Sequence, residues 1–406
     1  MHTRWLTRQL MVPALILGGV TGLIAWTNLR EGRPEGRSSR AVPARRAAAG
    51  TSSQELDRVV AGMNRRLEMN PGDVRAAVDL ADALLRLARV RSDGGLVARG
   101  EQALRAALDR NPADYQAQQM LGSIYLSQHK FRQAADVARR ATVLRPHDAI
   151  NFGMLGDALL ELGEYEPAFD AFDSMMQLRP NAAAYARVAY ARELQGDLAG
   201  SLESMRLALD AVPPGDSESL AWHHAQVGDL HLKLGNTAAA VQDFIAASHA
   251  FPGHPFAVLG YARALAARGD RDGAIAVLGR QADHTTNPDL HLLFGDLLAA
   301  SGRQTEATRH YAVVEAAWRG DTPEPRSLSK FLAARGRVDE AVAFAELAAR
   351  ARDDIFTDDA LAWAYHNAGR TSEAARAADR ALRTGTRDRD ILEHAAAIRA
   401  AVRARQ

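Results

Sequence analysis

Cysteine is absent from the 406-residue sequence. Disulfides, thiolate nucleophiles and cysteine-ligated zinc are therefore excluded, while the redox compartment stays open. Aromatic residues make up only 6% of the chain, and lysine occurs only as Lys130, Lys233 and Lys330. Ala, Leu and Arg dominate, and runs of Val, Ile or Thr are few. This composition favours helices over strands.

The motifs of common enzyme classes are also missing. The sequence has no G-x-S-x-G, no G-x-x-x-x-G-K-[ST], no G-x-G-x-x-G after a strand and no H-E-x-x-H. The formal net charge is +1, so there is no bulk attraction to nucleic acid. We therefore expect no catalysis, no cofactor, no small-molecule substrate and no nucleic-acid partner.

One long uncharged run lies near the beginning of the chain, from Gln9 to Asn28. As a helix, its 20 residues would just cross a hydrocarbon core of roughly 30 Å. Trp5 and Trp26 sit at its two ends, where amphipathic rings prefer the headgroup level. We expect residues 1–29 to hold an N-terminal tail and a single transmembrane anchor; a cleaved signal peptide is the alternative.

Residues 30–53 contain Arg, Gly, Pro, Ser and Ala without an apolar period, which predicts a flexible tether. The domain that follows the tether could lie on either side of the plasma or inner membrane. The count of arginines around the anchor favours the cytoplasm, whereas a short Arg-bearing tail before an apolar helix is typical of exported proteins. We favour the extracytoplasmic side as the working hypothesis.

A repeat of about 34 residues organises the remainder of the chain. It is clearest in two successive units whose matching residues have the same offsets. The first contains Leu121, Gly122, Tyr125, Ala134, Ala138, Ala141 and Pro146, and the second contains Leu155, Gly156, Leu159, Ala168, Phe172, Met175 and Pro180. Between the turn residues run two amphipathic helical stretches per unit, so the sequence predicts repeated helix pairs.

A glycine marks the expected tight turn inside seven of the units, where a left-handed residue is needed. These are Gly163, Gly196, Gly235, Gly269, Gly302, Gly336 and Gly369. A small residue of the second helix follows each of them, namely Ala168, Ser201, Ala240, Ala274, Ala307, Ala341 and Ala374. We expect these small residues to lie where two helices approach closely.

The phase predicts nine units within a domain at residues 54–406, at about 73–113, 114–147, 148–180, 181–213, 220–253, 254–286, 287–320, 321–353 and 354–386. Residues 54–70 should form a lead-in helix and residues 389–405 a closing helix, because a solenoid needs its end faces covered. The first unit is stretched between its helices by Arg91-Ser-Asp-Gly-Gly95.

The pattern of Leu-Gly, Tyr, Ala, Phe, Ala and Pro resembles the tetratricopeptide repeat family, whose unit is a helix-turn-helix of 34 residues. The resemblance covers most of the chain after the tether. The chain looks like the bacterial, membrane-anchored members of this family. This resemblance implies an all-α protein, a right-handed α-solenoid of about nine units preceded by one transmembrane helix. It further implies that the first helix of each pair faces a concave, partner-binding side.

Carried over residue by residue, the family's second, fifth and ninth positions give the expected partner-binding residues. They are Gln116, Gln119, Ser123, Asp157, Tyr190, Trp222, Asp229, Phe256, Arg263, Asp296, Arg326, Lys330, Phe356, Asp359 and Trp363. Such a mixture of aromatic and charged residues suits an extended peptide or a helix. Trp222, Phe256 and Trp363 are the expected anchors, whose truncation should weaken capture without changing the melting curve. A solvated helix face or packing between repeats is the alternative for each residue.

Two clusters could suggest a metal or acid–base site. His224 and His231 share a helix face next to His223, but three or four donors with supporting contacts are wanted for a metal, so we expect ordinary packed or surface histidines. Thr357, Asp358 and Asp359 are better explained as the start of a helix. We expect no metal at either place.

These observations favour a membrane-anchored scaffold that binds a protein or peptide. A second hypothesis is an accessory or substrate-presenting subunit of an envelope enzyme or of a secretion or assembly complex, with catalysis on another chain. An enzyme that uses His223, His224 and His231 is the least favoured hypothesis.

Overall fold

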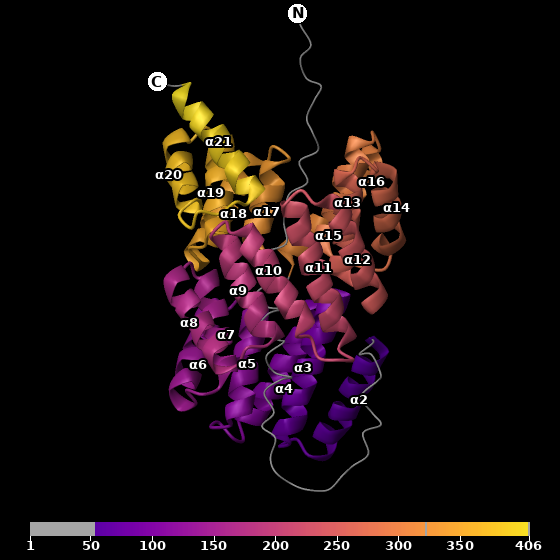
Figure 1. The fold of residues 1–406 in the computed structure, drawn as a ribbon, viewed down its shortest axis with the longest axis vertical. Helices are drawn as coiled ribbons and strands as arrows, with labels where there is room; N and C mark the ends of the chain where they lie inside the picture. The colour runs from indigo at the N-terminus through magenta and orange to yellow at the C-terminus, as the bar shows by residue number, and fades with distance from the viewer. Residues whose placement is uncertain (1–52, 321–322, 405–406) are drawn as a thin grey trace, which may run out of the picture.

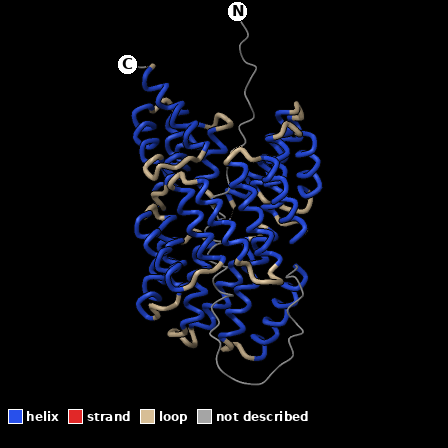
Figure 2. The backbone as a smooth tube through the Cα atoms, viewed as in Figure 1, coloured by secondary structure: helices blue, strands red, loops and turns tan. Residues whose placement is uncertain are grey.

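The computed structural model describes residues 53–320 and 323–404, and these residues contain twenty helices and no strand. The expected all-α architecture is confirmed, as Figures 1 and 2 show. The expected transmembrane helix within residues 1–29 and nearly all of the expected tether lie outside the described residues. None of the described helices is both long enough and apolar enough to cross a membrane.

A lead-in helix, α2 (Ser53–Met69), precedes nine helix pairs, which we number as units 1 to 9, and α21 (Arg389–Arg403) follows them. The first four units are α3 (Val74–Arg91) with α4 (Gly94–Leu108), α5 (Tyr115–Ser127) with α6 (Phe131–Leu144), α7 (Ala149–Glu161) with α8 (Tyr165–Leu178), and α9 (Ala182–Leu194) with α10 (Leu198–Asp210).

Units 5 to 9 continue the same arrangement. They are α11 (Ser217–Lys233) with α12 (Thr237–Ala250), α13 (Pro255–Ala267) with α14 (Arg271–Ala282), α15 (Pro288–Ala300) with α16 (Gln304–Arg319), α17 (Pro325–Ala333) with α18 (Val338–Ala351), and α19 (Ile355–Asn367) with α20 (Thr371–Ala381). Unit 5 begins at Ser217, three residues before the expected position, because Asp216 caps α11. In unit 1 the stretch from Arg91 to Gly95 adds no loop, because both glycines lie in α4.

Within a unit, a glycine of the first helix lies against a large side chain. A Cβ atom on Gly156 would overlap the ring of Phe172 and would lie 3.0 Å from the carbonyl oxygen of Ala168. Gly228 faces Phe244 of its own unit in the same way, and Gly260 of the next unit also faces Phe244. The seven small residues expected in the second helices are all fully buried. Small residues therefore let the two helices approach closely, while the ring fills the seam between them.

The seven turn glycines all have positive φ, from 72° to 85°, as the sequence predicts. In units 1 and 2 the equivalent positions are Ser92 and His129, with φ of 54° and 58°. Because a non-glycine residue is uncommon in this conformation, surrounding contacts must hold these two turns. Both residues do contact a distant unit.

The turns of units 1 to 3 lie against the beginnings of the units six places later, and the turn of unit 4 lies against the beginning of α21. Ser92 Oγ accepts a hydrogen bond from Asn287 Nδ2 (3.0 Å), so unit 1 meets unit 7. His129 pairs with Glu324 at the beginning of unit 8. Gly163 touches the Asp353 backbone before unit 9, and a Cβ atom on Gly196 would lie 2.5 Å from the carbonyl oxygen of Gly385 before α21.

The solenoid is therefore a superhelix with about six units per turn, whose second turn lies directly on the first. Figure 1 shows α18, α19 and α20 above α7 and α8. Around the turn glycines of units 5 to 8, Gly235, Gly269, Gly302 and Gly336, no other residue of the described ranges lies within 4 Å of where a Cβ atom would be. These four turns have no later unit to contact, which explains the difference from units 3 and 4.

We predict that Gly156→Ala lowers the free energy of unfolding by about 1–3 kcal/mol, because the new methyl group would displace the Phe172 ring. Gly62→Ala is the matched control, since Gly62 lies in α2 with no described residue within 4 Å of where its Cβ atom would lie, and the variant should gain roughly 0.5–1 kcal/mol. Urea unfolding followed by circular dichroism measures both. Equal effects of the two substitutions would contradict the proposed helix contact.

Candidate binding surface

The expected partner-binding residues fall into two groups by exposure. Seven are buried by the chain itself: Gln119, Ser123, Asp157, Tyr190, Trp222, Arg326 and Asp359. Gln116 is exposed, and the other seven are half-buried: Asp229, Phe256, Arg263, Asp296, Lys330, Phe356 and Trp363. Whether any of the fifteen contacts a partner stays a prediction.

Four of the buried polar members have polar partners within the chain, namely Gln119, Asp157, Arg326 and Asp359. Gln119 donates to Asn151 Oδ1 (2.9 Å) of the next unit. Asp157 accepts two hydrogen bonds from Arg187 of the next unit (3.0 and 2.6 Å), and neither side chain has any exposed surface. Burial raises the pKa of Asp157 to about 6 although Arg187 opposes this shift. These contacts join neighbouring units, so these side chains act in the stacking of units.

A second set of contacts joins unit 8 to unit 9 and α21. Lys330 Nζ lies 2.6 Å from Asp359, which also contacts His394 Nδ1 (2.8 Å). Burial works against the charge of Asp359, but Lys330 and His394 outweigh it and hold the pKa of this carboxyl at about 2. Trp363 stacks on His394 with ring centroids 4.1 Å apart. The anchor that the sequence suggested is thus partly covered by α21.

Half-buried charges from units 4 to 7 are electrostatically coupled. Lys233 Nζ lies 2.5 Å from Asp229 and 2.7 Å from Glu193. Arg263 interacts with Asp229 and with Asp289, whose pKa burial raises to about 6 against the attraction of Arg263. Side chains of four successive first helices therefore share one electrostatic environment on the inner side of the superhelix.

Several residues of this inner side were missed from the sequence. Arg187 and Lys233 do not fall at the positions carried over from the family, whereas Asp289 stands at the second position of its unit and Glu193 at the twelfth, but neither is among the expected partner-binding residues. Lys233 could have been found, because it follows Asp229 by four residues on one helix face. Arg187 carried no such signal, since its partner belongs to another unit.

The histidines and acids considered from sequence have structural partners. His223 is buried and contacts the Ser219 carbonyl oxygen (2.7 Å), while His224 and His231 both lie near Asp243, at 3.4 and 3.9 Å. Among the described residues, no group of three or more His, Asp or Glu side chains is arranged to hold a metal ion.

The helix that we expected to start near Thr357 starts two residues earlier, at Ile355. Asp354 caps α19 by accepting hydrogen bonds from the amides of Phe356 and Thr357 (both 3.0 Å). Asp358 instead pairs with Arg380 and Arg383.

A buried charged junction ties unit 1 to unit 5. Glu218 lies 2.5 Å from Arg89, 3.8 Å from Arg86 and 3.5 Å from His254, and its side chain is fully buried. Burial opposes its charge, but Arg89, His254 and Arg86 together lower the pKa of this carboxyl to about 2. Asp216 accepts a hydrogen bond from Arg86 at 3.0 Å.

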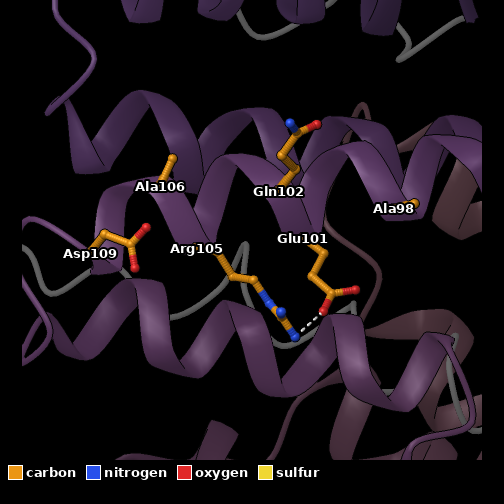
Figure 3. A pocket seen from close by; sticks show the side chains of 6 residues that line it. All are labelled: Ala98, Glu101, Gln102, Arg105, Ala106 and Asp109. Atoms are coloured by element: carbon orange, nitrogen blue, oxygen red, sulfur yellow. Dashed lines mark ion pairs between the residues drawn. The ribbon is translucent and has the colours of Figure 1, made fainter.

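The outer surface of unit 1 has a shallow groove of about 450 Å³ along α4 (Figure 3). Its charged side chains are Glu101, Arg105 and Asp109, and Glu101 pairs with Arg105 at 2.6 Å. Glu101 also accepts a hydrogen bond from Gln128 (2.7 Å). This groove lies on a second helix, away from the residues expected to bind a partner.

Comparison with known proteins identifies the type of repeat to which these helix pairs correspond. Residues 85–149, 120–183 and 231–293 match models described as tetratricopeptide repeat. The chain contains tetratricopeptide repeats. The matched segments fall in units 1 to 3 and in units 5 to 7, and the other pairs continue the same pattern. A comparison with curated proteins found no match.

Solved structures of this architecture are similar to most of the chain. The human IFIT1 dimer with m7Gppp-AAAA is 17% identical, with a TM-score of 0.52, over 82% of this chain and 77% of that one. Yeast Tom70 is 15% identical, with a TM-score of 0.45, over 87% and 86%. The APC/C hetero-tetramer Cut9-Hcn1 is 13% identical, with a TM-score of 0.47, over 86% of this chain and 60% of that chain. At these identities the likeness concerns the fold alone.

We predict that Glu218→Gln lowers the melting temperature most at neutral pH and progressively less as the pH falls from about 4.5 to about 2. The depressed folded pKa means that the charge of Glu218 stabilises the fold above its unfolded pKa and that this contribution disappears on acidification. Calorimetry of the parent and the variant over this range measures the difference. Glu203→Gln, on an exposed position of α10, is the control and should have no such trend.

Trp222→Ala should lower the free energy of unfolding by about 3–5 kcal/mol, because the ring is 1% exposed and packs in a core cluster. The expectation from sequence, an unchanged melting curve, does not fit this burial. Thermal unfolding followed by circular dichroism tests it. A parental melting curve would mean that Trp222 lies at the surface.

Proposed function

We propose that the chain is a membrane-anchored scaffold that binds a protein or peptide partner on the inner side of its solenoid, with no catalysis of its own. Stacked tetratricopeptide repeats are a fold consistent with protein–protein interaction, and this observation carries the proposal. The half-buried Phe256, Lys330 and Trp363 support it, because aromatic and charged side chains together favour peptide recognition.

The anchor in the proposal rests on the uncharged run from Gln9 to Asn28 and on its flanking tryptophans. Residues 30–53 would then connect the membrane to α2. We place the solenoid on the extracytoplasmic side as part of the same proposal. No nucleic-acid partner is proposed, because the formal net charge is only +1.

Partner capture by the tagged full chain, cross-linked in cells that express it and identified by mass spectrometry, tests the proposal. Phe256→Ala and Trp363→Ala should each weaken capture of the identified partner by about 2 kcal/mol or more, as expected for aromatic hot spots. Arg309→Ala, at an exposed position of α16, is the control and should leave capture unchanged. Melting curves must show that each variant is folded.

Full capture by both folded aromatic variants would contradict an inner binding site. Recovery of one constant stoichiometric partner with an enzymatic activity would instead favour the accessory-subunit hypothesis.

A further inference from the structure

The second turn of the superhelix covers the inner side of the first turn. Tyr190 and Trp222 of units 4 and 5 belong to one buried apolar cluster with Ile355 and Ile391, which begin α19 and α21. Two of the positions that the sequence suggested for a partner, Tyr190 and Trp222, are thus covered by the chain itself. The segment that begins unit 9 contacts unit 3 directly.

This segment, Arg352 to Phe356, contacts unit 3 through one charge, one backbone amide, one apolar side chain and the Asp353 backbone beside Gly163. Arg352 Nη1 lies 2.9 Å from Glu161 Oε2, and both side chains are almost fully buried. The amide of Ile355 donates to the Tyr165 hydroxyl (2.8 Å). The Ile355 side chain is completely buried in the cluster. A basic residue followed three positions later by an apolar residue is therefore bound at unit 3.

These contacts are fewer than those between neighbouring units. Neighbouring units pack through long apolar seams in addition to buried pairs such as Asp157 with Arg187. Among the described residues, the second turn adds only Ile355, Ala381 and Ile391 to the buried apolar cluster of units 3 to 5, and it otherwise meets unit 3 through an ion pair and isolated hydrogen bonds. When a buried ion pair separates, both charges regain their hydration, which offsets much of the lost attraction. The contact between turns is therefore the one that can open while every unit stays folded.

We propose that Arg352 to Phe356 is an internal ligand that closes the second turn over unit 3, and that the partner displaces it. The partner would present an arginine or lysine to Glu161 and, three residues later, a large apolar side chain to the cluster around Tyr190 and Trp222. This inference rests on the proposed function and specifies the chemistry of its partner. It also accounts for how residues buried in the closed state become anchors in the open state.

The absence of cysteine allows a direct test on the full chain. Glu164 and Asp353 are exposed positions on either side of the contact and can carry spin labels as Glu164→Cys and Asp353→Cys. Double electron–electron resonance should give one short distance in the parent and a second, longer population in Arg352→Ala. Arg350→Ala, at an exposed position of α18, is the control and should keep the single distance.

A labelled synthetic peptide of residues 350–359 is the probe for the vacated site. It should bind the Arg352→Ala chain about tenfold or more tightly than the parent, because the parent must first release its own segment. A peptide with Arg352 and Ile355 replaced by Ala should not bind. The charge swap Glu161→Arg with Arg352→Glu should restore the single short distance.

A single short distance in Arg352→Ala, or equal binding of the peptide to both chains, would overturn the proposal. If Arg352→Ala does not fold, Glu161→Gln gives a milder test with the same expected direction. Both measurements are made without the natural partner. Their failure is therefore distinguishable from a failure of the proposed function, which would appear as an absence of partner capture.

Discussion

The turns of units 1 to 4 lie against the beginnings of units 7, 8 and 9 and of α21, and this spacing determines which surfaces of the chain are accessible. Each unit is rotated by a similar amount relative to the one before it, because the same small residues set the same helix contact. About six such rotations bring the chain back over its own beginning. The inner side of units 3 to 5 is consequently covered by the second turn, whereas the turns of units 5 to 8 stay open.

Charged pairs stabilise this closed arrangement, as they also do between neighbouring units. Glu218 between Arg89 and His254, and Glu161 beside Arg352, are buried acids paired with bases far away in sequence. A buried pair contributes little compared with an apolar contact of the same size, but loss of one member is costly. The Glu161–Arg352 pair specifies one register between the turns, and its removal is expected to release it, whereas Glu218 joins unit 1 to units 5 and 6 within the first turn.

The repeat architecture could be predicted from the sequence because it depends on local signals. Gly156 and Ala168 recur at fixed offsets, and a turn glycine such as Gly163 must accommodate positive φ whatever lies nearby. The burial of Trp222 and Tyr190 could not be predicted in this way. It depends on Ile355 and Ile391, more than a hundred residues later, and on the number of units per superhelical turn. No residue within a single unit indicates how many units complete one superhelical turn.

The central claim is that about six units complete one turn, and an engineered disulfide tests it most directly. Ser92→Cys and Asn287→Cys, 195 residues apart in sequence, replace side chains whose polar atoms are 3.0 Å apart. In a chain without other cysteines, they should oxidise under native conditions to a faster-migrating species on a non-reducing gel. Ser92→Cys with Ser301→Cys, at the far end of α15 and about 20 Å away along the helix, should not. Free thiols in the first pair under the same oxidising conditions would contradict the two-turn arrangement.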